Sequence, residues 1–67
     1  MTYEQATDLY IANIDQPHGK LFAQSVGRFQ EGFLADGVTD DIDDAFRRGV
    51  ECAEKFIDLF KVRAVSK

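Results

Sequence analysis

The N-terminal segment carries apolar residues at the spacing of a short amphipathic helix. Four of them share one stripe: Tyr3, Ala6, Tyr10 and Ile14. Thr2 and Gln5 match the capping-box pattern, in which each side chain bonds the other residue's backbone N–H group. A helix is therefore predicted over residues 3–14.

Residues 15–19, Asp-Gln-Pro-His-Gly, interrupt this pattern. Asp15 is a favourable N-cap, and Pro17 fits the first turn of a helix. We therefore predict a kink or a tight turn into a second helix that runs to about Ala35. Its apolar seam has spacings of four, three and four residues: Phe22, Val26, Phe29 and Phe33.

A helix stop and a new helix start follow closely. Asp36, Gly37 and Val38 are typical of a C-cap, a left-handed glycine and an apolar residue that folds back onto the helix. Thr39 or Asp40 is expected to cap a third helix. The apolar seam of this helix comprises Ile42, Phe46, Gly49, Ala53, Phe56 and Phe60.

Charges on the third helix fit a solvent-exposed outer face. Three acid–base pairs with a spacing of four residues are expected: Asp43–Arg47, Asp44–Arg48 and Glu51–Lys55. The cations Lys61, Arg63 and Lys67 follow near the end that the helix dipole makes negative. Because the connection is short, the second and third helices should pack antiparallel. The prediction is an all-α single domain over residues 1–67, with a long helical hairpin and a short N-terminal helix.

The third helix has more apolar surface than one neighbouring helix covers, since apolar residues occupy about half of its circumference. A 67-residue chain is also marginally stable alone. We therefore predict a homodimeric bundle. The candidates for helix or subunit contacts are Ala45, Gly49, Cys52, Ala53 and Leu59. On the second helix, Ala23, Gly27 and Gly32 are expected to allow close helix approach.

Composition excludes several classes of protein. Hydrophobic residues make up 45% of the chain, which argues against a disordered tail. No apolar run approaches the length of a membrane span, and residues 1–19 contain no lysine or arginine, so neither a membrane segment nor a signal peptide is expected. The single cysteine suits a reducing cytoplasm.

The residues with reactive side chains lack suitable partners. His18 is interpreted as an exposed turn residue, and Cys52 as a small buried hydrophobe. The glycines do not have the spacing of a phosphate loop, and no Cys/His cluster suggests zinc. We therefore expect no enzymatic activity, no cofactor and no metal site.

Residues 36–44 form the one unusual polar segment. They hold five aspartates: Asp36, Asp40, Asp41, Asp43 and Asp44. Helix capping accounts for two or three of these carboxylates, and the spacing does not fit an EF-hand. The group is a candidate site for a partner protein with a basic patch. Direct nucleic-acid binding is not expected from a chain with a net charge of −4.

The expected function is a non-catalytic protein-binding regulator or inhibitor. Its size and charge are typical of proteins that phages or mobile elements encode to block a host protein. Two alternatives stay open: an acidic mimic of nucleic acid that occupies a basic groove, and a protein that binds a small ligand at an oligomer interface.

Overall fold

The computed structural model describes the backbone of residues 1–65 and the side chains of residues 1–59. Three α-helices follow one another: α1 (Tyr3–Ile14), α2 (Gly19–Ala35) and α3 (Ile42–Val65). No β-strand occurs within residues 1–65. The predicted all-α fold, a helical hairpin with a short N-terminal helix, is confirmed. The side-chain predictions for Phe60, Lys61, Arg63 and Lys67 lie outside the described residues.

The first helix has the predicted bounds and the predicted cap. The Thr2 hydroxyl accepts a hydrogen bond from the Gln5 amide, and the Gln5 side chain accepts one from the Thr2 amide. This reciprocal capping satisfies two of the backbone N–H groups that a helix start leaves free. Ala6 is the fully buried residue of α1 and faces the other two helices.

The start of α2 differs from the prediction. Asp15 terminates α1 instead of capping α2, and residues 15–18 form a turn outside both helices. The second helix begins at Gly19, with His18 in the N-cap position. The turn is so tight that a Cβ atom on Gly19 would overlap the backbone carbonyl of Ile14. Pro17 therefore serves this turn and not the first turn of a helix.

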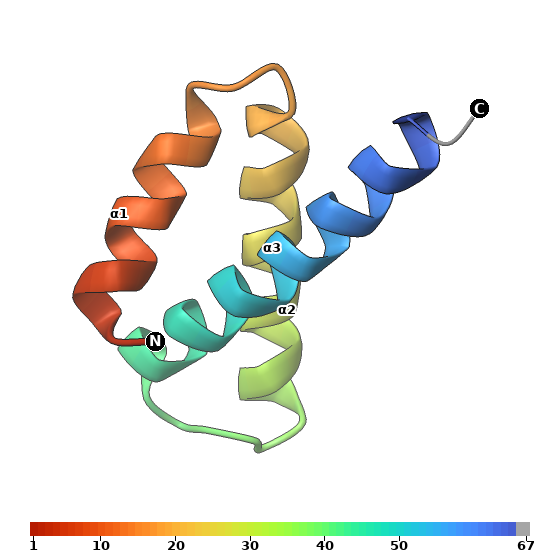
Figure 1. Cartoon of the computed structure of the whole chain (residues 1–67). Helices are drawn as coiled ribbons and strands as arrows, with labels where there is room; N and C mark the ends of the chain where they lie inside the picture. The colour runs from red at the N-terminus through yellow and green to blue at the C-terminus, as the bar shows by residue number, and fades with distance from the viewer. Residues whose placement is uncertain (66–67) are drawn as a thin grey trace.

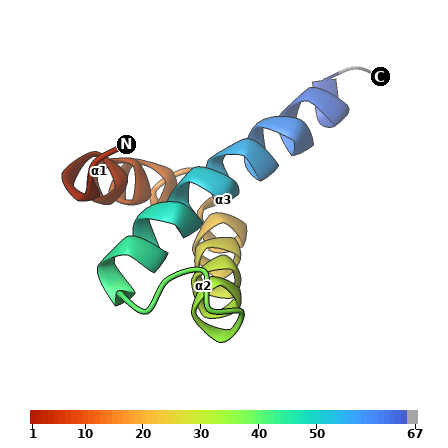
Figure 2. The same ribbon diagram turned by 90° about the horizontal axis from the view of Figure 1, so that it is seen from below.

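The third helix runs obliquely to the other two. Figure 1 shows α1 and α2 running in opposite directions, with α3 starting beside the N-terminal end of α1 and passing obliquely across α2. The view from below shows the C-terminal part of α3 extending away from the other two helices (Figure 2). The third helix packs more extensively against α2 than against α1.

The buried core draws on all three helices. Its members are Ala6, Phe22, Val26, Val50, Ala53 and Ile57. Tyr10 connects the helices, because its ring centre lies 6.0 Å from that of Phe22 and 5.5 Å from that of Phe46. Such tilted aromatic pairs add to the energy gained from burial alone.

The buried face of α3 is rotated from the predicted seam. Ile42 and Phe56, expected in the seam, have exposed fractions of 65% and 43%. Val50 and Ile57, which are not members of the predicted seam, are fully buried. The reason is geometric: α3 packs against α1 as well as α2, so the centre of its buried face is set by two neighbours.

Glycines have opposite packing roles in the two long helices. A Cβ atom on Gly49 would lie only 2.9 Å from the Val26 carbonyl oxygen, so α2 and α3 approach closely there. A Cβ atom on Gly27 or Gly32 would meet no atom within 4 Å. The small-residue prediction is therefore right for Gly49 and wrong for Gly27 and Gly32.

Candidate functional site

The connection between α2 and α3, residues 36–41, begins with a glycine-based helix stop. Gly37 has a φ angle of 73°, in the left-handed region. The Val38 amide donates to the Phe33 carbonyl at 2.9 Å, and the Gly37 amide donates to the Leu34 carbonyl. This is the Schellman arrangement, and it reverses the chain direction within a few residues. The predicted stop signal is confirmed.

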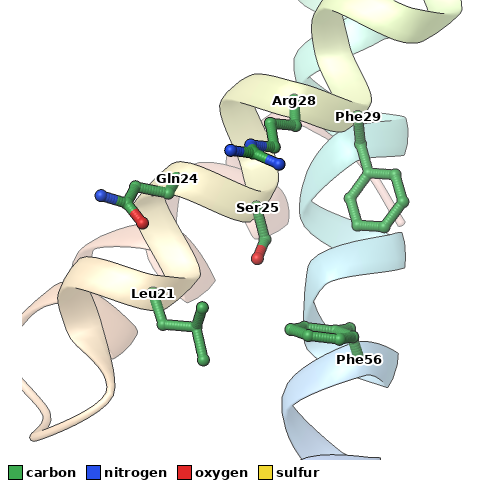
Figure 3. A pocket seen from close by; sticks show the side chains of 6 residues that line it. All are labelled: Leu21, Gln24, Ser25, Arg28, Phe29 and Phe56. Carbon is green, nitrogen blue, oxygen red and sulfur yellow. The ribbon is translucent and has the colours of Figure 1, made fainter.

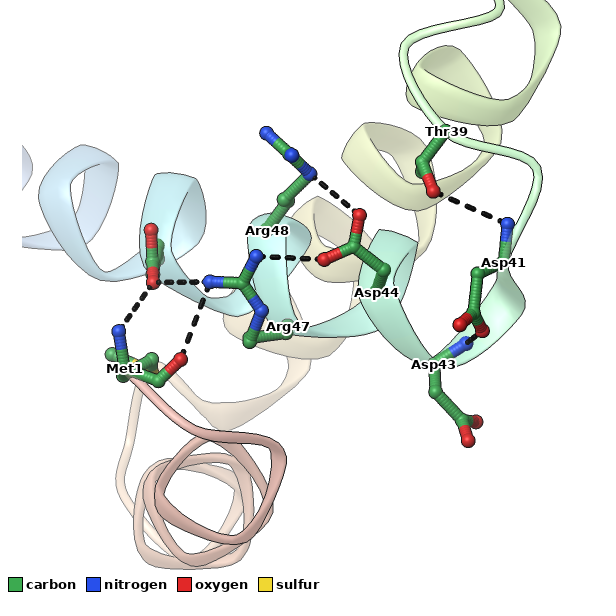
Figure 4. A network of polar contacts seen from close by, with 8 residues as sticks. Met1, Thr39, Asp41, Asp43, Asp44, Arg47 and Arg48 are labelled. Atoms are coloured by element: carbon green, nitrogen blue, oxygen red, sulfur yellow. Dashed lines mark hydrogen bonds and ion pairs between the residues drawn. The ribbon is translucent and has the colours of Figure 1, made fainter.

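Asp41 caps α3, one residue beyond the predicted positions. Its carboxylate accepts a hydrogen bond from the Asp43 amide at 2.9 Å, and its carbonyl accepts the Ala45 amide. The Thr39 hydroxyl instead accepts a hydrogen bond from the Asp41 amide at 3.2 Å, which holds the cap residue itself (Figure 4). One of the five aspartates therefore belongs to the fold.

Asp44 also has a structural role. It lies 2.7 Å from an Arg47 guanidinium nitrogen and 2.9 Å from the Arg48 Nε atom (Figure 4). Hydrogen bonds from Arg48 and then Arg47 hold the pKa of the Asp44 carboxyl far below its usual value. The predicted Asp44–Arg48 pair is present, whereas the predicted Asp43–Arg47 pair is replaced by Asp44–Arg47.

Arg47 continues this network to the beginning of the chain. Its guanidinium donates to Glu51 and to the Met1 carbonyl, and the Met1 amino group lies 2.9 Å from the Glu51 carboxylate. The hydrogen bond from that amino group lowers the pKa of Glu51. The predicted Glu51–Lys55 pair forms no ion pair among the described side chains, because Glu51 turns toward Met1 and Arg47, and Lys55 affects the Glu51 pKa only through its charge.

The remaining side chains of this region project into solvent. We define the bend residues as Asp36, Val38, Asp40, Ile42 and Asp43, all of which are exposed. No hydrogen bond joins their side chains to another described residue. Val38 and Ile42 have exposed fractions of 51% and 65%. The sequence prediction of an acidic site missed these two apolar residues because it assigned them to packing.

A second feature lies on the face between α2 and α3. An open groove of about 390 Å³ is lined by Leu21, Gln24, Ser25, Arg28, Phe29 and Phe56. Figure 3 shows the Ser25 hydroxyl directed into the groove from α2, with Phe56 of α3 across from it. The apolar rings and the cationic Arg28 suit an occupant with an apolar part and a negative charge.

The candidates for helix or subunit contacts separate into two groups. Ala45, Gly49 and Ala53 are buried within the single chain. Cys52 is only partly buried, in contrast to the predicted burial, and Leu59 is exposed. Of these candidates, only Cys52 and Leu59 therefore leave side-chain surface exposed on the single chain.

His18 lies in the turn before α2 and is half-buried. Its Nε2 atom is 2.8 Å from the Asn13 Oδ1 atom, so it joins the end of α1 to the turn. No group of three or more His, Cys, Asp or Glu side chains among the described residues has the arrangement of a metal site.

Comparisons with protein-family models, curated proteins and solved structures find no match for this chain. Among the described residues, no helix combines the length and the apolar composition needed to cross a membrane. The candidate sites are therefore interpreted from their own chemistry.

Proposed function

We propose that this protein is a non-catalytic protein-binding regulator or inhibitor that contacts its partner through the bend residues. One observation carries the proposal: three carboxylates and two apolar side chains project from the connection between α2 and α3 and from the first turn of α3, and their side chains form no hydrogen bond or ion pair with the rest of the described chain. Asp41 and Asp44 perform the capping and ion pairing that the fold needs there.

The composition of the bend favours a particular kind of partner. Exposed apolar side chains beside charged ones are typical of surfaces that bind proteins, where apolar contacts provide affinity and charges guide association. The carboxylates of Asp36, Asp40 and Asp43 would attract a basic patch. Val38 and Ile42 would then enter an apolar depression beside it.

Two observations make nucleic-acid mimicry a weaker candidate. Arg47 and Arg48 pair with Asp44 next to the bend, which reduces the negative potential that a phosphate mimic requires. The exposed Val38 and Ile42 also have no counterpart in a phosphate backbone.

Small-ligand binding at an oligomer interface is not favoured, since the groove between α2 and α3 is lined by residues of one chain.

The biological setting forms part of the proposal. The regulator acts in the cytoplasm, consistent with its single free cysteine. A phage or mobile element encodes it, and its target is a host protein. A target that handles nucleic acid would provide the basic patch that the bend residues require.

Affinity capture from the source cells tests this function. The bend variant Asp36→Asn/Asp40→Asn/Ile42→Gln is compared with wild type and with Glu31→Gln/Asp58→Asn, which makes the same charge change at exposed sites outside the bend. A protein captured by wild type and the control should bind the bend variant at least about tenfold more weakly, equivalent to about 1.4 kcal/mol. Equal capture by the bend variant would overturn the proposal.

A further inference from the structure

The groove between α2 and α3 has apolar surface that the described chain leaves exposed and a charged group that it leaves unpaired. Phe56 is 43% exposed at its edge, and Leu59, three residues further along α3, is 65% exposed. Arg28 has no ion-pair partner among the side chains of residues 1–59. The groove therefore combines open apolar surface with an available guanidinium group (Figure 3).

One flank of α1 is exposed and carries negative charge, opposite in sign to that of Arg28 in the groove. Ile11 and Ile14 have exposed fractions of 53% and 42%. Asp8 lies three residues before Ile11, and Asp15, the C-cap of α1 in helical backbone conformation, lies four residues after it, so both acids are on the same flank. Residues 1–19 contain no lysine or arginine, so this apolar flank is uniformly acidic.

We propose that the groove of one copy binds the α1 flank of a second copy. Ile11 and Ile14 would cover the apolar wall formed by Leu21, Phe29 and Phe56, while Asp15 would pair with Arg28 and Asp8 would add negative charge beside it. The two surfaces complement each other in both apolar character and charge. In a two-fold dimer each copy supplies one groove and one flank, so the contact occurs twice and closes the assembly.

Reciprocal charge changes test this interface without knowledge of any other partner. Sedimentation equilibrium is measured for wild type, Arg28→Glu, Asp15→Lys and the control Lys20→Glu, which reverses an exposed cation of α2 outside the groove lining. Wild type and the control should dimerise equally. Arg28→Glu and Asp15→Lys should each dissociate at least about tenfold more readily, equivalent to about 1.4 kcal/mol.

The decisive sample is an equimolar mixture of Arg28→Glu and Asp15→Lys. In a mixed dimer both groove–flank contacts again join opposite charges, so dimerisation should return toward the wild-type level. Circular dichroism of each variant checks that it is folded, and Ile11→Ser, which leaves all charges intact, should also weaken the dimer. A wild-type monomer at up to roughly 100 μM overturns the proposal. So does a dimer that Arg28→Glu and Ile11→Ser leave unchanged, or a mixture that fails to recover.

Discussion

At the scale of single residues, Gly49 lies where α2 and α3 approach each other closely. A Cβ atom there would lie 2.9 Å from the Val26 carbonyl oxygen and 3.4 Å from the Gln30 amide nitrogen. Both neighbours are backbone atoms, which cannot turn aside as a side chain end would. The two helices can therefore pack at their observed separation because glycine has only a hydrogen atom in place of a Cβ atom.

Gly49→Ala should destabilise the protein relative to Gly27→Ala. Both changes gain helix propensity of up to about 1 kcal/mol, but only the first forces backbone atoms apart, at a cost of about 1–3 kcal/mol. Urea unfolding of the two variants measures the difference, because the shared propensity gain cancels. Equal stability of the two variants would mean that α2 and α3 can separate at no cost at Gly49.

At the scale of elements, the helices could be predicted from the sequence more completely than their ends and faces. The residue spacing and the capping pattern of Thr2 and Gln5 define α1 almost fully, and Gly37 defines the end of α2. The sequence alone does not identify the residue that caps α3. Three consecutive residues all favour the N-cap position: Thr39, Asp40 and Asp41. Only the path of the connection makes Asp41 the cap.

The buried face of α3 shows a second limit. Apolar residues occupy about half of this helix, so spacing alone does not determine the centre of the buried stripe. Packing against both α1 and α2 buries Val50 and Ile57 and leaves Ile42 and Phe56 exposed. Because Ile42 was assigned to the buried stripe, the sequence predicts an acidic site and does not include this exposed apolar residue in it.

At the scale of the whole molecule, charge links the beginning of the chain to the N-terminal half of α3. The ion pairs run from Met1 through Glu51 and Arg47 to Asp44 and Arg48, and thereby tie the start of α1 to α3. The pKa values of Asp44 and Glu51 are both lowered in the folded protein. A carboxyl group with a lowered folded-state pKa stabilises the fold at pH values above its unfolded-state pKa.

Stability should consequently fall as the solution becomes acidic. The contribution of Asp44 and Glu51 is fully present near neutral pH and is lost as protonation proceeds, from about pH 5 downward. Urea midpoints measured across this range should decrease for wild type, and Asp44→Asn should show a smaller decrease. Asp43→Asn is the matched control, since its carboxylate has no hydrogen-bond partner among the described residues, and its midpoints should follow the wild-type curve. If the urea midpoints of wild type and Asp44→Asn fall in parallel with decreasing pH, Asp44 is not a source of the pH dependence.

The central claim is that the bend residues are not needed for folding and are therefore free to bind a partner. The most direct test is the free energy of unfolding of Asp36→Asn/Asp40→Asn/Ile42→Gln, measured in urea beside wild type and Asp41→Ala. Exposed residues outside structural contacts should change stability by no more than about 0.5 kcal/mol, whereas loss of the Asp41 cap should cost about 0.5–2 kcal/mol. The account predicts a bend variant that matches wild type while Asp41→Ala is weakened. A bend variant destabilised as much as Asp41→Ala would contradict it, because those side chains would then serve the fold.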